Sequence, residues 1–172
     1  MPEAIAQAHR VLEIDSTAYT DTYSQLGFAY LFSGKPDSAM LAFETQYRLD
    51  PQAPKVLGTM ALGYAALGRW QDAERVRADI IGMHGQAADI SRLYSDLAFG
   101  DWVGALSVLE RAKNGRYLGA MNLRLGCDPL FEPLKSSPRF AVLMSELGLR
   151  TCQSQGQWPI KVPANLRGPP RA

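Results

Sequence analysis

The side chains best suited to chemistry are few in this sequence, and they do not form a known catalytic motif. His84, Ser91 and Asp96 are the residue types that act as base, nucleophile and acid in a hydrolytic triad. The sequence around Ser91 contains no nucleophile elbow, which would present the serine on a tight turn between a strand and a helix. His9 and His84 both fall at positions that we expect on the surface. We therefore expect no catalytic residue and interpret the chain as a non-enzymatic protein.

The sequence also lacks the spacings that bind phosphates or metals. The glycines from Gly58 to Gly68 are not followed by the Lys-Ser or Lys-Thr pair of a phosphate-binding loop. The two cysteines, Cys127 and Cys152, form no Cys-x-x-Cys pair. This argues against a zinc ribbon and against a disulfide scaffold, and it is compatible with a reducing compartment. We expect neither a cofactor nor a metal ion.

The composition narrows the class of protein. A formal net charge of +1 gives no strong field for nucleic acid or membrane, and an apolar content of 47% is typical of a folded domain. No run of 18 apolar residues could span a membrane, and residues 1–10 do not form a secretory signal. We therefore expect a cytoplasmic protein without nucleic-acid binding or membrane insertion.

Apolar residues recur at helical spacing in the stretch that organises the chain, over residues 20–33 and again over 36–49. The recurring positions are Tyr23, Leu26, Gly27 and Tyr30 in the first run, and Ala39, Phe43 and Tyr47 in the second. Gly34, Lys35 and Pro36 break the pattern between them. The pattern predicts two antiparallel helices, which cross most closely at the small residues Gly27 and Ala39.

The same pattern returns about 34 residues later and again after about 32 more. Gly34 and Ala39 reappear as Gly68 and Ala73, and then as Gly100 and Ala105. Two positions depart from the repeat. Arg77 stands where the first copy has Phe43, and Asp96 stands where it has Tyr30. Residues 2–14 fit only the second helix of a copy, which suggests a fragment of a larger protein.

These repeats resemble the tetratricopeptide repeat in the spacing of Leu26, Gly27, Tyr30, Ala39 and Pro51, with Tyr23 where the family usually has tryptophan. The resemblance implies an all-α fold, a right-handed α-solenoid of antiparallel helix hairpins with a C-terminal capping helix. The expected parts are a half repeat at 1–16, hairpins at about 17–51, 52–85 and 86–114, a capping segment at 115–150 and a tail at 151–172. The expected helices cover about 2–14, 17–33, 36–49, 54–67, 70–82, 87–99, 102–112 and 138–147, with a short one at 116–125.

The capping segment carries a second resemblance. Asp128-Pro129, Pro133 and Pro138-Arg139-Phe140 resemble the ending of bacterial signalling proteins in which such repeats follow a winged-helix regulator, a nucleotide cyclase or a kinase domain. Ser137 and Pro138 predict the start of the capping helix. The tail after it has four prolines, three basic residues and no acid, so we expect it to be disordered and dispensable for stability.

Aromatic residues opposite the core stripe predict a binding groove. Phe28 and Phe32 lie one turn apart on that face, and Leu62 and Tyr94 occupy the position of Phe28 in the next copies. By the resemblance, this face lines the concave side. The expected groove residues are Ser24, Phe28, Phe32, Lys55, Leu62, Ile90 and Tyr94.

Ser24 and Phe28 stand at two of the places where chaperone-binding members of the family clamp a terminal carboxylate. We therefore expect the groove to bind a protein or peptide segment that is apolar or aromatic rather than acidic. Two alternatives stay open. Neighbouring helices could bury these aromatic residues as ordinary core, or the domain could sense a small molecule and control a fused effector.

Overall fold

The computed structural model describes residues 2–15, 20–53, 55–114, 125–150 and 166, and every regular element in these ranges is helical. In chain order the elements are α1 (Pro2–Ile14), α2 (Thr20–Phe32), α3 (Pro36–Leu49), α4 (Val56–Ala66), α5 (Trp70–Ile81), α6 (Gln86–Phe99), α7 (Trp102–Asn114), the 3-10 helix η2 (Pro129–Leu134) and α8 (Pro138–Glu146). The all-helical expectation is therefore confirmed for this part of the chain. None of these helices is long and apolar enough to cross a membrane.

Glycine and proline set the helix ends where the sequence predicted them. Gly34, Gly68 and Gly100 follow α2, α4 and α6 with φ of 71°, 72° and 69°, a conformation that residues with a Cβ rarely adopt. Pro36 and Pro138 begin α3 and α8, where a missing N–H costs nothing. The expected caps at residues 16–17 and the short helix at 116–125 fall wholly or almost wholly outside the described residues.

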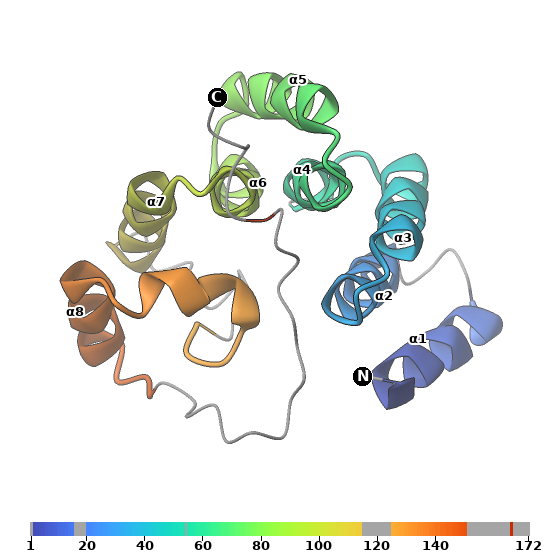
Figure 1. Ribbon diagram of the computed structural model, residues 1–172, viewed down its shortest axis with the longest axis horizontal. Helices are drawn as coiled ribbons and strands as arrows, with labels where there is room; N and C mark the ends of the chain where they lie inside the picture. Colours follow the sequence, from blue (N-terminus) through green and yellow to red (C-terminus); the bar gives the residue numbers. More distant parts are fainter. Residues whose placement is uncertain (1, 16–19, 54, 115–124, 151–165, 167–172) are drawn as a thin grey trace.

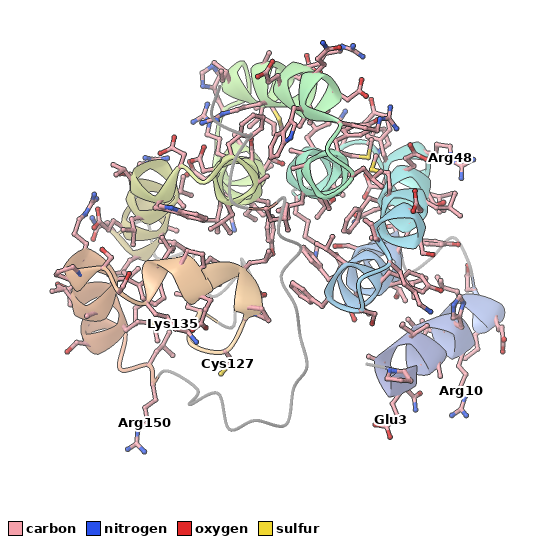
Figure 2. The ribbon with its side chains drawn as sticks, in the orientation of Figure 1. Glu3, Arg10, Arg48, Cys127, Lys135 and Arg150 are labelled. Atoms are coloured by element: carbon pink, nitrogen blue, oxygen red, sulfur yellow. The ribbon has the colours of Figure 1, made fainter. Side chains whose placement is uncertain are left out.

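Each α-helix packs against the next one in the chain, from α1 against α2 to α7 against α8. Figure 1 shows the result as an arc, with α2, α4 and α6 on its inner side and α3 and α5 on its outer side. α4 also packs against both α2 and α6. We call α2, α4 and α6 the inner helices. Arg48 projects outward from α3 (Figure 2).

Phe43 is the side chain around which the first hairpins pack. Its ring is fully buried, and a Cβ added to Gly27 of α2 would overlap it. A Cβ on Gly63 of α4 would come within 3.1 Å of the same ring and 2.5 Å of the sulfur of Met40. Only glycine at these two positions lets α2 and α4 approach the aromatic ring of α3.

The C-terminal helices cover the end of α7. Phe131 of η2 and Phe140 of α8 are fully buried in the same core as α6 and α7. Arg139 donates to Glu110 of α7 with two nitrogens, at 3.2 and 2.7 Å, and Lys113 reaches Glu146 at 2.5 Å. A helix is thus present as α8 where the sequence predicted one, and buried side chains and ion pairs hold it against α7.

The cysteines differ from the expectation. Cys127, in the loop that precedes η2, is disulfide-bonded, and it is labelled in Figure 2. Cys152 lies outside the described residues. A disulfide depends on which Cα atoms the fold brings close together, and sequence spacing does not reveal that. Disulfides are typical of oxidising compartments, so the bonded state of Cys127 does not support the interpretation that the cysteines are compatible with a reducing one.

Candidate binding surface

Four aromatic rings from three different helices meet beside α4. Phe28 of α2 stacks on Phe32 at 6.1 Å between ring centroids, and it meets Phe43 of α3 edge-on at 5.6 Å. Phe28 also lies 5.4 Å from Tyr94 of α6, so it links two inner helices that are not consecutive. We call these four residues the inner aromatic cluster. Such pairs add about 0.5–1.5 kcal/mol each beyond the area they bury.

Most of the expected groove residues are buried rather than open to solvent. Phe28 is half-buried and packs against the main core, and Lys55 keeps 20% of its side chain exposed. The remaining residues are at most 9% exposed, namely Ser24, Phe32, Leu62, Ile90 and Tyr94. The alternative that neighbouring helices bury these side chains therefore describes their exposure better than an open groove does. Their role in binding is a separate matter and stays a prediction.

Gly58 explains why Tyr94 is buried. A Cβ at Gly58 of α4 would lie 2.6 Å from the backbone oxygen of Ser91 and 2.8 Å from the Cβ of Tyr94. The glycine therefore lets the backbones of α4 and α6 approach closely, with the buried Tyr94 against α4. Sequence reasoning considered Gly58 only as part of a phosphate loop. The largely apolar sequence of α4, in which nine residues are buried, is the signal that could have predicted a helix surrounded by others.

Acidic side chains lie around Tyr94. Burial raises the pKa of its hydroxyl above the ordinary value, and the carboxylates of Asp128 and Asp21 raise it further, so the group stays protonated. Asp128 caps η2 by accepting from the backbone N–H of Leu130 at 2.9 Å. Asp21, at the start of α2, pairs with Lys55 at 2.7 Å. Lys55, the expected cation of the groove, is therefore in an ion pair with a carboxylate.

The two departures from the repeat are partners in the structure. Arg77 of α5 donates to Asp96 of α6 at 3.2 Å and to Asp101 at 3.1 Å, and its guanidinium lies 4.6 Å from the ring centre of Phe99. Burial raises the pKa of Asp96 from 3.8 to about 6, although Arg77 opposes the change. Arg77, which replaces the aromatic residue of the first copy, is thus paired with Asp96, which replaces the tyrosine of the other copies. Gly104 makes room for both carboxylates.

The residues that could have formed a catalytic site have other partners or environments in the structure. His9 is hydrogen-bonded to the Tyr30 hydroxyl at 3.0 Å, and His84 is exposed. Ser91 is fully buried, and Asp96 is held by Arg77. Among the described residues no group of three or more His, Cys, Asp or Glu side chains is placed to hold a metal ion.

No family model matches this chain, and no curated protein and no solved structure shows significant similarity to it. The likeness to the tetratricopeptide repeat therefore depends on the spacing of residues in the sequence.

Proposed function

We propose that this chain is a protein-binding module, a tetratricopeptide-like right-handed α-solenoid whose inner helices hold an extended segment of a partner protein. The packing of each helix on the next, and the glycines against Phe43, support the solenoid part of the proposal. The resemblance of the capping segment extends it to the interaction or regulatory module of a larger bacterial signalling protein. A cytoplasmic location is not needed for this function.

The observation that carries the proposal is the inner aromatic cluster. Phe28 contacts three other rings, yet it is not fully buried and keeps part of its side chain accessible. An aromatic side chain that is held rigidly by its neighbours and still accessible is the usual anchor of a protein interface. An incoming apolar side chain would pack against it without paying to order a flexible residue.

The charges near the cluster define the chemistry of the partner. The carboxylates of Asp128 and Asp21 both raise the pKa of Tyr94, and Asp21 is paired with Lys55 at 2.7 Å. A further carboxylate on an incoming segment would be repelled by these two groups, whereas an apolar or lysine-flanked segment would not. This agrees with the expectation of an apolar or aromatic segment rather than an acidic one.

The test is a titration of short fluorescent peptides that share one leucine or phenylalanine anchor and carry either lysine or aspartate flanks. The lysine-flanked peptides should bind, and Phe28→Ala should weaken them by roughly 2 kcal/mol, about 30-fold in Kd. Tyr47→Ala is the matched control because Tyr47, on the outer helix α3, is 42% exposed and lies outside the cluster. Tyr94→Ala is avoided, since Tyr94 is buried and its loss would disturb the fold.

Equal binding to the Phe28→Ala and Tyr47→Ala variants would remove the cluster from the binding surface. Circular dichroism must show that both variants keep their helical signal. If no peptide binds, but a small molecule raises the melting temperature, the alternative of a sensor domain would replace this proposal.

A further inference from the structure

The chain after α8 returns to the loop that contains Cys127. Gly148 has a φ of 64°, the left-handed conformation that ends a helix and turns the chain. Arg150 then passes so close to Gly126 that a Cβ at Gly126 would overlap the backbone oxygen of Arg150. Glycine at this position allows the two stretches of backbone to touch. The chain just before Cys127 therefore lies against the chain just after α8.

The covalent bond of Cys127 lies beside this contact. Cys127 is exposed and disulfide-bonded. The sequence contains one other cysteine, Cys152, which follows Arg150 by two residues. A disulfide requires Cα atoms within about 7 Å of one another. The contact of Gly126 with Arg150 brings the two stretches of chain together in the way that a bond between these cysteines requires.

We propose that a disulfide between Cys127 and Cys152 is a redox-sensitive lock on the C-terminal cap, which opens when a dithiol reduces the bond. The cap is η2 and α8, and both lie between the two cysteines in the sequence. This inference does not depend on the proposed function.

The lock contradicts the expectation that the tail is dispensable. Cys152 belongs to residues 151–172, for which the sequence predicted a disordered tail. Leu166 of the same tail is 3% exposed and belongs to the main core, so that expectation is wrong at this position. A bond from Cys152 to Cys127 would join the tail covalently to the loop before η2, and deletion of the tail would then remove the lock.

The non-covalent contacts of the cap leave it able to open. Both η2 and α8 pack on α7, and Phe131 and Phe140 are fully buried there. The ion pair of Arg139 with Glu110 is exposed, at 46% and 38% of the two side chains, and exposed pairs contribute little to stability. Opening would uncover both phenylalanines and the apolar face of α7 beneath them. The state of the bond therefore controls the exposure of an apolar surface.

The bond acts on the open state of the cap through chain entropy. It closes a loop of about 25 residues, and a cross-link of this span disfavours the open state by a factor on the order of 10². Without the bond, the cap should open about 100 times as often. Helices outside the loop, such as α3 and α4, keep their own contacts and should not change.

Reduction is a two-electron exchange between the chain and a dithiol. A thiolate of the dithiol attacks one sulfur of the bond and forms a mixed disulfide, and the first cysteine leaves as a thiolate. The second thiol of the reagent then displaces the other cysteine and closes the reagent's own disulfide. The dithiol is oxidised, and the chain gains two electrons and two protons as two thiols. Because Cys127 is exposed, an attacking thiolate has access to its sulfur.

The experiment is amide hydrogen exchange of the full chain, followed by mass spectrometry, with and without excess dithiothreitol. Peptides from α8 should exchange about 100-fold faster after reduction, and peptides from α3 and α4 should not change. Cys127→Ser should give fast exchange of α8 in both buffers. Ser136→Ala is the matched control, because Ser136 is exposed and lies inside the same loop without taking part in the bond. Its exchange should still respond to the dithiol.

Digestion of the oxidised monomer without reductant should yield one fragment that links Cys127 to Cys152. A fragment that instead joins Cys127 of two chains would overturn the inference, and so would equal exchange of α8 in the two buffers. Faster exchange of α3, α4 and α8 alike, with loss of the helical signal, would also overturn it, because the bond would then support the whole fold. Reoxidation should restore slow exchange, and exchange that stays fast would show that the bond is not a reversible lock.

Discussion

The Asp96→Asn substitution should change how stability depends on pH, because Asp96 is a buried carboxyl. Its side chain is 14% exposed and is held by Arg77, which also holds the more exposed Asp101. Asparagine has nearly the same shape and cannot ionise. Arg77 keeps Asp101 as a charged partner in the variant. The comparison therefore isolates the cost of ionising one carboxyl inside the fold.

The size and sign follow from the pKa of Asp96. A rise from 3.8 to about 6 corresponds to about 3 kcal/mol in favour of the protonated carboxyl in the folded state. The folded chain therefore binds more protons than the unfolded chain between about pH 4 and pH 6. The contribution of Asp96 to the free energy of unfolding is thus largest below about pH 4 and is lost as the pH rises to 6.

Urea denaturation at a series of pH values measures this effect. The free energy of unfolding of the Asp96→Asn variant minus that of the wild type should rise by up to about 3 kcal/mol from pH 4 to above pH 6. Taking the difference cancels the contributions of the other carboxyl groups. A difference that stays constant across this range would refute the argument that burial outweighs the attraction of Arg77.

Two further substitutions test the close helix crossings, and the first of them has a control of the same type. Gly58→Ala should cost roughly 1–3 kcal/mol of unfolding free energy, because the new methyl group meets the backbone of Ser91; Gly82→Ala, whose Cβ would meet only the oxygen of Asp79 at 3.7 Å, should cost much less. Equal effects would show that α4 and α6 are not this close. Ala39→Leu should also cost about 1–3 kcal/mol, because Ala39 is fully buried. An unchanged melting temperature would show that the register of the α2–α3 hairpin is wrong.

The sequence allowed the helices to be placed because their ends depend on local chemistry. Gly34, Gly68 and Gly100 permit the left-handed backbone that ends a helix, and Pro36 and Pro138 favour its first turn. These effects act within a few residues, so they are visible without knowledge of the fold. The assignment of the repeats to a family uses longer-range spacing and stays a prediction.

The exposure of the candidate site could not be predicted in the same way. Helical periodicity places Phe28 and Tyr94 on a face of their own helices, but it does not say what covers that face. The cover depends on distances between helices, which Gly58 sets through a contact with α6. The ion pair of Arg77 with Asp96 and the burial of Leu166 are also long-range effects. In the sequence, Arg77 and Asp96 appeared as departures from the repeat, and Leu166 appeared as part of a disordered tail.

The central proposal is that the inner aromatic cluster contacts an apolar segment of a partner protein. The most direct measurement is photo-cross-linking of the full chain with p-benzoylphenylalanine in place of Phe28, followed by mass spectrometry of the linked fragments. We expect cross-links from position 28 to an added lysine-flanked peptide that carries a leucine or phenylalanine anchor. The same reagent in place of Tyr47 should give none. Cross-links to the peptide that form equally from positions 28 and 47, or only from position 47, would contradict the proposal.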